Sequence, residues 1–527
     1  MPEKGKLGEL MELVLPKGIS AAAFDAALAD FRSVVGDQWV LATDSDRETY
    51  LDAYALGDGH NHAPSAAVAP ASVEEVQALL RLANRHKVPL WPVGRGKNLG
   101  YGSAAPAIPG TMVLDMSRMN RIEADGHFAH ALIEPGVGFF DLYNHLKDND
   151  IPLWMSVPGN AWGSVIGNAL ERGIGYTPFG DHTDMLCGLE VVLPDGEIVR
   201  TGMGAMEGGK AWQHYQHGFG PDWAQMFVQS NFGIVTKAGV WLQPEPEMSA
   251  KVTINLPKFE DISWAVDVLA ELRRRDVIQH NIVFGNYLHD ASVFSQRSEW
   301  YDGPGAIPDD VSQKIIDHYG SGWWSFTLRL FGYEGTVKSH MQVLRDMIEP
   351  KLGKALEFTE WRKGDPIEKS ARGIPSVLAL QIVNWHGGRG GHVGFSPVMP
   401  PDGALALAQA KRMKARFEEA GLDYYTSFTM GRRHISNVNL LIYDRDNADM
   451  IARTRKLFET LIEDSAKMGY AEYRTHPDFM DRIARGFDFN NHALFRLNER
   501  LKAMLDPNGI IAPGKNGIGT ALKGGAA

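Results

Sequence analysis

The stretch "PLWPVGRGKNLGYGSAAP" (residues 89–106) places a glycine-rich loop directly after an apolar, strand-like segment. The loop is not a P-loop, because an asparagine follows Lys97 where the Ser or Thr that contacts magnesium would stand. It is not a Rossmann fingerprint, because the spacing from Gly94 through Gly96 to Gly100 is one residue too long. Closely spaced glycines nevertheless let the backbone approach a ligand and turn its N–H groups toward an anion. The residues alone leave two interpretations open: an anion-binding loop and a plain turn between strands.

The length, composition and charge of the chain are those of a multidomain globular enzyme. Its 527 residues exceed what one hydrophobic core usually serves, so we expect two or more domains. The hydrophobic fraction of 44% and the charged fraction of 22% are ordinary for such a protein. A net charge of -11 argues against a nucleic-acid partner, which would require a basic surface.

The cysteine count and the apolar runs predict a soluble, cytoplasmic protein. Cys187 has no second cysteine to pair with, which excludes an internal disulfide and a cysteine-based metal cluster and favours a reducing compartment. No stretch is apolar for long enough to span a membrane. The N-terminal segment has neither the apolar core nor the small-residue cleavage site of a secretory signal.

Local patterns predict mixed helices and strands in the first half of the chain. Ser72 and Glu75 have the spacing of a helix-capping box, and apolar residues follow at helical intervals before the strand-like "VPLWPV". "LEVVLPDGEIVRTG" is typical of a hairpin that turns at Pro194-Asp195-Gly196. The glycine-rich loop therefore follows a strand, where a ligand-binding loop is mechanically plausible.

The pattern changes near residue 247, where prolines flank a new strand in "LQPEPEMSAKVTINLP". Long amphipathic helices follow, such as "EDISWAVDVLAELRRRD" and "MIARTRKLFETLIEDSAKMG", and they alternate with β-rich runs. This alternation predicts an α+β domain with helices on one face of a sheet. The final "DPNGIIAPGKNGIG" again has the character of the first half, so we expect the tail to fold back onto it.

Six segments together resemble the vanillyl-alcohol oxidase family of flavoproteins, in the same order, from about residue 65 to residue 517: "GRGKNLGYGSAAP", "WGSVIGNALERGIGYTPFGDH", "SNFGIVTKAGVWL", "GGHVGFSP", "EYRTH" and "LDPNGIIAPGK". The bacterial eugenol oxidases are similar in length and in the phrases "RGIPSV" and "GGHVGFSP". The resemblance implies an α+β flavoprotein with two domains. The FAD-binding domain would be split between residues 1–246 and 471–527, and an α+β cap domain would occupy residues 247–470.

The resemblance also assigns residues to FAD. The family loop whose backbone holds the pyrophosphate is matched by Gly94, Arg95, Gly96, Lys97 and Asn98. Amide donors with two cations suit a diphosphate. His392 in "GGRGGHVGFSP" matches the histidine that is covalently joined to the flavin ring, the alternative being a buried, hydrogen-bonded histidine. Further positions near the flavin are matched by Ser164, Glu171, Gly173, Ile234, Arg474 and Lys515.

The family's subsite for a phenol hydroxyl is matched by Tyr101, Tyr473 and Arg474. A para-substituted phenol gives up hydride from its benzylic carbon most easily as the phenolate, which two O–H donors and a guanidinium would stabilise. The hydride would pass to flavin N5 and leave a p-quinone methide. Tyr176 in "GIGYTPFG" matches a further pocket-lining position. Without the resemblance, Tyr101 would be interpreted as an aromatic that closes the loop, and Arg474 as a surface cation.

The chain departs from the family pattern beside the flavin. Relatives have an aspartate that helps to activate water toward the quinone methide and supports covalent flavin attachment. Here "SVPGNAWGS" puts Gly159 in its place, and the neighbouring amide of Asn160 is no general base at neutral pH. The small residues Gly159 and Gly394 either admit a bulkier substrate or reflect tight backbone packing.

Two histidine patterns remain. Relatives carry Arg-Glu-Met-His-His in the cap where this chain has "RHISN", so His434 is a candidate for the missing base; the alternative is a histidine on the cap surface. His60 and His62 in "DGHNHAPS" have metal-ligand spacing, but no third ligand is evident. We therefore expect no metal site, and a role in flavin attachment is the alternative for this pair.

The predicted function is FAD-dependent oxidation of para-substituted phenols: 4-hydroxybenzyl alcohols, 4-alkylphenols or 4-allylphenols, and bulkier lignin-derived phenolics. Dioxygen is the expected electron acceptor, which would give H2O2. Three alternatives stay open: a p-cresol methylhydroxylase-like dehydrogenase that passes electrons to a carrier protein, loss of a side-chain fragment from the quinone methide, and a degenerate flavin-binding protein. We expect a homodimer or larger homo-oligomer that binds neither nucleic acid nor membranes.

Overall fold

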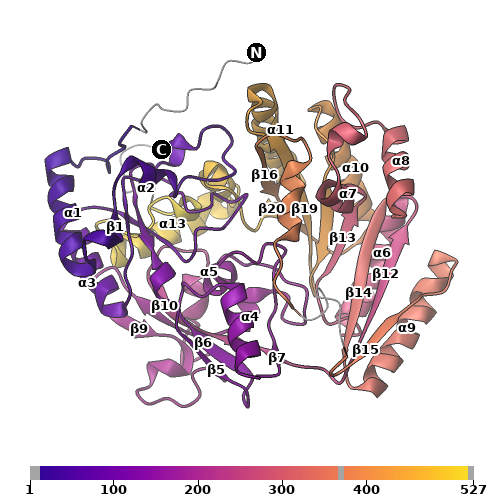
Figure 1. Cartoon of the computed structure of the whole chain (residues 1–527), viewed down its shortest axis with the longest axis horizontal. Helices are drawn as coiled ribbons and strands as arrows, with labels where there is room; N and C mark the ends of the chain where they lie inside the picture. The colour runs from indigo at the N-terminus through magenta and orange to yellow at the C-terminus, as the bar shows by residue number, and fades with distance from the viewer. Residues whose placement is uncertain (1–11, 366–372, 520–527) are drawn as a thin grey trace.

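The computed structural model describes residues 12–365 and 373–519, and its two halves lie side by side (Figure 1). The first half, in indigo and magenta, has several small sheets, whereas the second, in pink and orange, is built on one large sheet. This α+β arrangement in two parts is the one that the sequence predicts. No helix within the described ranges is long and apolar enough to cross a membrane.

Two sheets carry the first half. A four-stranded sheet has the order β1-β2-β4-β3, in which β2, β4 and β3 are parallel and β1 is antiparallel to β2. An antiparallel five-stranded sheet has the order β5-β6-β10-β8-β9, and β7 pairs with β11. The strands are β1 (Val40–Leu41), β2 (Ala67–Val68), β3 (Leu90–Val93), β4 (Met112–Asp115), β5 (Ile122–Asp125), β6 (His130–Ile133), β7 (Leu153–Trp154), β8 (Leu186–Val192), β9 (Ile198–Arg200), β10 (Ile234–Trp241) and β11 (Gln243–Pro244). The helices are α1 (Ala21–Val35), α2 (Asp44–Glu48), α3 (Val73–His86), α4 (Phe139–Asp148) and α5 (Val165–Leu170).

The helix before the glycine-rich loop begins where the sequence predicts. Ser72 caps α3 by accepting a hydrogen bond from the Glu75 amide at 3.2 Å. The Glu75 carboxylate accepts from the amide of Ala71 at 2.7 Å, one residue before the cap. The apolar face of α3 is buried in the core of the four-stranded sheet, and β3 then leads the chain into the loop. The predicted hairpin is also present, since β8 pairs with β9.

The second half is built on a nine-stranded antiparallel sheet. Its path is β15-β12-β14-β13-β18-β19-β17-β20, and β16 pairs with β19 outside that path. The strands are β12 (Met248–Leu256), β13 (Ile282–Asn286), β14 (Trp324–Gly332), β15 (Thr359–Arg362), β16 (Gly390–Phe395), β17 (Pro397–Met399), β18 (Thr426–Met430), β19 (Ile435–Asp444) and β20 (Ala471–Glu472). The helices of this half are α6 (Ile262–Arg274), α7 (Leu288–Phe294), α8 (Asp309–Tyr319), α9 (Glu334–Leu352), α10 (Gly403–Glu419) and α11 (Ala448–Lys467).

Strand alternation gives the large sheet two different faces. On one face, Phe284 and Phe428 are buried in a core with α6, α9 and α10. Their neighbours in sequence, Val283 and Ser427, point the other way and line a cavity, as does His392 on β16. One face of the sheet therefore supports the fold, and the opposite face is available to a ligand.

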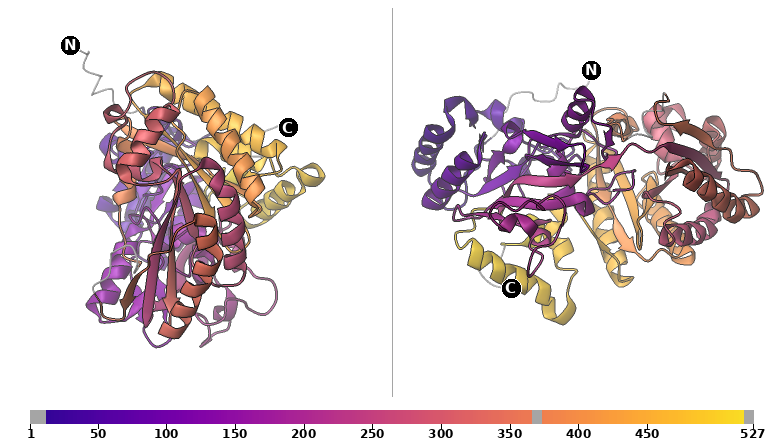
Figure 2. Two further views of the ribbon diagram at one scale, coloured as in Figure 1. Left: turned by 90° about the vertical axis from the view of Figure 1, so that its right-hand side faces the viewer. Right: turned by 90° about the horizontal axis from the view of Figure 1, so that it is seen from below.

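The C-terminal segment returns from the large sheet to the first half, where α12 (Met480–Ala484) and α13 (Phe489–Leu505) lie in yellow below the indigo and magenta elements (Figure 2). The Leu90 amide donates to the Ile510 carbonyl at 2.7 Å, and the Leu90 carbonyl accepts from the Ala512 amide at 2.8 Å. The tail thus extends the edge of the four-stranded sheet next to the glycine-rich loop. The residue limits of the domains stay a prediction.

Candidate functional site

A cavity of about 420 Å³ lies between the two halves. Its walls come from the loop after β3, the segment around α5, the start of β10, one face of the large sheet and the chain after β20. All predicted site residues line it except Gly173 and His434. Segments that are distant in the sequence therefore meet around one space.

Close backbone contacts shape the glycine-rich loop. A Cβ on Gly94 would lie 2.7 Å from both the Pro135 carbonyl oxygen and Ser164 Cβ, so only glycine fits there. The side chain of Asn160 donates to the Lys97 carbonyl at 3.0 Å and holds the loop from the opposite wall. The loop backbone is thereby fixed at the edge of the cavity, where its N–H groups can meet an anion.

The two cations of the loop differ in their surroundings. Arg95 Nη1 lies 2.6 Å from Asp141 Oδ2 and donates to the Gly136 carbonyl at 3.1 Å, so its charge is balanced within the protein. Lys97 Nζ lies 4.9 Å from the centre of the Trp162 ring and, in the described part of the chain, has no carboxylate within ion-pair distance. An anion at this loop would therefore meet backbone amides and Lys97 before Arg95.

Ser164 and Asn98 fix the backbone on either side of the cavity. Ser164 Oγ caps α5 by accepting from the Gly167 amide at 3.0 Å, and it donates to the Pro135 carbonyl at 2.6 Å. The Asn98 carbonyl accepts from the Tyr101 amide at 3.0 Å, which turns the Tyr101 side chain into the cavity.

The remaining predicted positions contribute to the wall or support it. Lys515 Nζ and Glu171 Oε1 form an ion pair at 2.6 Å, which ties the C-terminal segment to the first half. Ile234 is the buried first residue of β10. Gly173 lies behind the wall, where any Cβ would overlap the side chain of Asn168, a residue that does line the cavity.

His392 is enclosed and only partly satisfied. It is buried on β16, and its Nδ1 has no hydrogen-bond partner in the described structure. Burial lowers the pKa of its imidazole to about 4, so the ring is neutral at physiological pH. Gly100 lies against the ring with φ +80°, and a Cβ there would overlap His392. A neutral imidazole with an unpartnered nitrogen, in a residue that lines the cavity, is suited to bond to a ligand.

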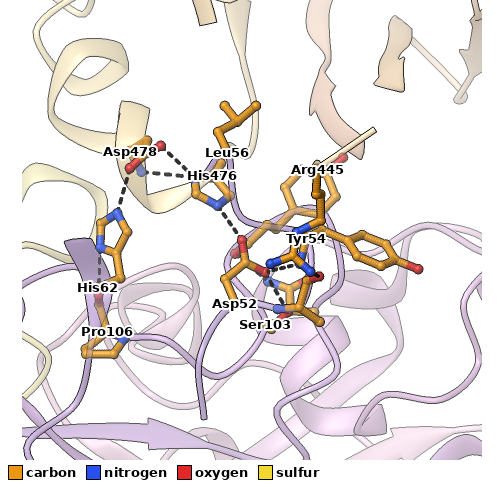
Figure 3. Close-up of polar contacts among 12 residues, drawn as sticks. Asp52, Tyr54, Leu56, His62, Ser103, Pro106, Arg445, His476 and Asp478 are labelled. Atoms are coloured by element: carbon orange, nitrogen blue, oxygen red, sulfur yellow. Dashed lines mark hydrogen bonds and ion pairs between the residues drawn. The ribbon is translucent and has the colours of Figure 1, made fainter. Parts of the chain in front are cut away.

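A polar network connects Asp52, Tyr54, His62, His476 and Asp478 (Figure 3). The Tyr54 ring contacts the His392 ring edge-on at 5.2 Å. Asp52 accepts from the Tyr54 amide at 3.1 Å, and His476 Nε2 donates to Asp52 Oδ2 at 2.9 Å. His62 contacts Asp478 at 2.7 Å in the same network, whereas its sequence neighbour His60 stays exposed. The described residues contain no group of acidic, histidine or cysteine side chains that could hold a metal ion.

The predicted phenol subsite forms around one cation. Arg474 Cζ lies 4.1 Å from the centre of the Tyr101 ring and 5.5 Å from that of Tyr473. Its Nε is buried without a partner, and no carboxylate of the described chain lies within ion-pair distance of the guanidinium. The guanidinium therefore has no ion-pair partner in the described chain, although Tyr101 hydrogen-bonds to it and the Glu171 carboxylate acts on it from farther away.

The protonation states around Arg474 suit the recognition of an anion. Burial raises the pKa of Tyr473 to about 12, although Arg474 opposes the rise, so the phenol group stays a donor at neutral pH. Burial also raises the pKa of Tyr176, against the effect of Arg329 and Arg474. Burial alone would lower the pKa of Arg474, but the adjacent tyrosines raise it, so the guanidinium stays charged.

Position 159 and position 394 differ in the space around them. A Cβ on Gly394 would lie 2.6 Å from the Tyr101 hydroxyl, so this glycine reflects tight packing. A Cβ on Gly159 would lie 3.4 Å from the Tyr176 hydroxyl and 3.9 Å from Ala379 Cβ, which are ordinary contacts. Only Gly159 therefore leaves room that a larger side chain could occupy.

Histidine 434 is not placed to replace the missing aspartate. It packs over Gly431, where a Cβ would lie 2.9 Å from its Nδ1, and it does not line the cavity. Besides His392, the second half places His289 and Tyr425 in the cavity, and the sequence analysis missed both of these residues. Strand alternation marks β13 and β18 as two-faced, but which face meets a ligand depends on the assembled sheet.

The lining residues fit an FAD cofactor. The tightly packed glycine-rich loop presents backbone and Lys97 to a diphosphate, and the unpartnered His392 Nδ1 can bond to the flavin. Arg474 and its tyrosines remain free for a second, phenolic ligand in the same space.

Comparisons with known proteins agree with this site. Residues 64–202 match the FAD binding domain family, and residues 378–516 match the C-terminal domain of FAD linked oxidases. The chain is 36% identical over 520 residues to the flavoprotein subunit of 4-cresol dehydrogenase (hydroxylating) from Pseudomonas putida, covering 97% of this chain and 99% of that one.

Two solved structures have the same fold. The structure of 4-ethylphenol oxidase from Gulosibacter chungangensis, in its isoeugenol complex, matches with a TM-score of 0.91 and 34% identity over 96% of this chain and 99% of that one. The structure of p-cresol methylhydroxylase with substrate bound matches with a TM-score of 0.92 and 34% identity, and the match covers 97% of this chain and 100% of that one.

Fold, cavity and comparisons together define an FAD-dependent oxidoreductase of the FAD-linked oxidase class. More particularly, the chain belongs to the vanillyl-alcohol oxidase family of phenol-oxidising flavoproteins. The predicted family, fold, enzyme class and cofactor are thereby confirmed.

Proposed function

We propose that the protein oxidises para-substituted phenols at the benzylic carbon, with 4-alkylphenols and 4-hydroxybenzyl alcohols as substrates. The observation that supports this most is the Arg474 cation, which has no ion-pair partner in the described chain and is flanked by Tyr101 and Tyr473 in the cavity that also contains His392. The names of the similar proteins, which refer to 4-cresol and 4-ethylphenol, support the same substrate class.

The subsite residues would bind the phenol as its phenolate. Two tyrosine hydroxyls donate to the substrate oxygen, and Arg474 adds a charge in a site from which the bulk of water is excluded. Such a site lowers the pKa of the bound phenol. Because the phenolate pushes electron density toward the para carbon, loss of hydride from the benzylic position becomes easier and leaves a p-quinone methide.

Bound FAD supplies the acceptor for that hydride. The part of this chain is to ionise the phenol at Arg474, to orient its para substituent and to close the cavity with one face of the large sheet. We further propose a covalent link between His392 and the flavin, because its Nδ1 is buried, neutral and unpartnered. Acid precipitation tests the link: the yellow colour should stay with the protein pellet, and in His392→Ala it should move to the supernatant.

We propose dioxygen as the electron acceptor, with H2O2 as the product. The name of 4-ethylphenol oxidase supports an oxidase, whereas that of 4-cresol dehydrogenase supports transfer to another carrier. Reoxidation of the reduced flavin in air-saturated buffer separates the two. Complete reoxidation within one turnover supports the oxidase, and reoxidation that is slow relative to reduction supports the dehydrogenase.

The proposed reaction is tested by mixing the flavin-loaded protein, without oxygen, with 4-ethylphenol, vanillyl alcohol and a phenolic lignin dimer. Bleaching of the flavin absorbance by at least one of these phenols is the expected result. If flavin-loaded protein is bleached by no phenol of the panel, the proposal is wrong and the degenerate, non-catalytic alternative is favoured.

A further inference from the structure

The cavity contains few groups that can accept a proton. The only carboxylate among its described lining residues is Glu171, which is already ion-paired with Lys515 at 2.6 Å. The lining histidines of the described chain are His289 and His392, and the latter is assigned to the flavin. Gly159 contributes no side chain. By elimination, His289 is the base of the described lining that neither the flavin nor another lining residue occupies; its partner, Asp290, lies outside the lining.

The fold holds His289 in place. It is the second residue of α7, directly after β13, and its ring stacks on the Tyr425 ring with 5.9 Å between centres and 27° between planes. Its Nδ1 lies 3.7 Å from Asp290 Oδ1, and 44% of the side chain remains exposed. Gly285 lies beneath it, since a Cβ there would lie 2.6 Å from His289 Cβ. The imidazole is thus supported from below and open toward the cavity.

His289 and Arg474 come from different parts of the assembly. Arg474 belongs to the chain after β20, whereas His289 enters from the cap together with the hydroxyl residues Ser427 and Thr429 of β18. A phenol whose oxygen binds Arg474 directs its para substituent away from that cation. The para substituent is the part of the substrate on which a base must act once the quinone methide has formed.

We propose that His289 is the general base for addition of water to the quinone methide, in place of the aspartate that the family resemblance leads us to expect where this chain has Gly159. This rests on the proposed phenol oxidation. The water oxygen bonds to the benzylic carbon, and the electron pair of the exocyclic double bond returns to the ring as a phenolate at Arg474. The proton of the water passes to His289. The product is a phenol with a benzylic hydroxyl, and the step involves no net oxidation.

The experiment compares wild type with His289→Gln in the flavin-loaded, full-length protein, using 4-ethylphenol. Two quantities are measured: the rate of flavin bleaching without oxygen, and the ratio of benzylic alcohol to 4-vinylphenol among the products. A general base contributes at least about a hundredfold to its step, so we expect the ratio to fall by at least about tenfold in the variant. Bleaching should change by less than about threefold, because hydride loss precedes the step.

Matched variants complete the comparison. Asp290→Asn should lower the ratio less than His289→Gln, because it removes only the group beside the base. His434→Gln, outside the cavity, should leave the ratio as in wild type. Normal bleaching with an unchanged ratio in His289→Gln overturns the inference alone, as does a wild type that forms no alcohol. Absence of bleaching in wild type instead overturns the proposed phenol oxidation, and the inference with it.

A second measurement needs no variant. Diethyl pyrocarbonate modifies accessible histidines, and mass spectrometry reports the rate at each one. 4-tert-Butylphenol has no benzylic hydrogen and cannot be oxidised there, so it serves as an inert occupant of the cavity. It should slow modification of His289 by at least about fivefold, since a bound ligand buries most of such a site, and leave His434 unaffected. Equal rates at His289 with and without the phenol would contradict its placement beside the substrate.

Discussion

Position 159 has room for the carboxylate expected there from the family resemblance, because a Cβ on Gly159 makes only ordinary contacts with Tyr176 and Ala379. We expect Gly159→Asp to fold with a melting temperature within about 3 °C of wild type, as for a substitution that creates neither a clash nor a cavity. In the double variant Gly159→Asp/His289→Gln, the alcohol-to-vinylphenol ratio should be at least about tenfold higher than in His289→Gln alone, because the new carboxylate would act as the general base at the same carbon. Product chromatography checks this. If the flavin-loaded double variant keeps the low ratio of His289→Gln, the two positions do not serve the same step.

Position 100, unlike position 159, has no room for a side chain, because Gly100 has a φ of +80° and contacts the His392 ring. Gly100→Ala should lower the free energy of unfolding by about 1–3 kcal/mol through backbone strain. It should also displace His392, so that the flavin no longer precipitates with acid-treated protein. Gly335→Ala, at an open position in α9, is the control and should be neutral or slightly stabilising. Retention of the flavin in the Gly100→Ala pellet would contradict the proposed role of this contact.

Among the elements, helices were the part of the fold that the sequence predicted best. The spacing of apolar residues located α3, α6 and α11, because each buries one face against a neighbouring sheet. The order of the nine strands could not be predicted, since β16 pairs with β19 and β12 with β14 across long intervening stretches. Pairing over such distances depends on the whole assembly and leaves no local pattern.

The candidate site, like the fold, has residues that could be predicted from the sequence and residues that could not. The family resemblance, carried by locally spaced motifs, assigned the loop at Gly94, His392 and the pair Tyr473-Arg474, and all of these line the cavity. Gly173, assigned in the same way, lies behind the wall. His289 carries no such motif, because its place in the cavity depends on how α7 and the large sheet assemble around that space. Substitution of the cap motif around His434 drew attention to a residue that points elsewhere.

The short strand β20 contains a buried acid whose effect depends on pH. Glu472 Oε1 accepts from the Ser396 amide at 2.7 Å, and burial raises the pKa of the carboxyl from 4.5 to about 8. The folded state keeps this proton where the unfolded state has lost it. The contribution of the protonated Glu472 to the free energy of unfolding is therefore fully present below about pH 4.5. It is lost as the pH rises to about 8, by at most about 1.4 kcal/mol per pH unit.

Glu472→Gln should remove this slope, because glutamine does not ionise and can still accept from the Ser396 amide. Urea denaturation at about pH 5 and about pH 8 measures it, and the variant should gain stability relative to wild type at the higher pH. Parallel pH dependence in the two proteins would mean that Glu472 is ionised in the folded state.

In the whole molecule, the C-terminal segment packs against the first half of the chain through a buried ion pair. Lys502 on α13 is fully buried, pairs with Asp506 at 2.6 Å and donates to the carbonyls of Asn231 and Ile511, each at 2.7 Å. One side chain thus joins the tail to the segment that begins β10. The homodimer expected from the resemblance stays a prediction, and light scattering on the purified protein would measure it.

Lys502→Met should lower the free energy of unfolding by about 3–5 kcal/mol, because it leaves the Asp506 carboxylate buried without its cation. Urea denaturation measures the loss. The double variant Lys502→Met/Asp506→Asn removes both charges and should recover part of the stability. A single variant as stable as wild type would show that the tail does not depend on this pair.

The central proposal is that Arg474, which has no ion-pair partner in the described chain, binds the substrate as a phenolate. The most direct test compares wild type with Arg474→Lys and measures the rate at which 4-ethylphenol reduces the flavin without oxygen. Lysine keeps the charge but lacks the planar fork that lies beside both tyrosine rings and that, in the proposed reaction, binds the substrate oxygen. We expect the second-order rate constant to fall by at least about a hundredfold in the variant, the scale of losing one preorganised donor, and 4-ethylanisole, which cannot form a phenolate, to leave wild type unbleached. Equal rates in both proteins, or reduction by the anisole as fast as by the phenol, would contradict the account.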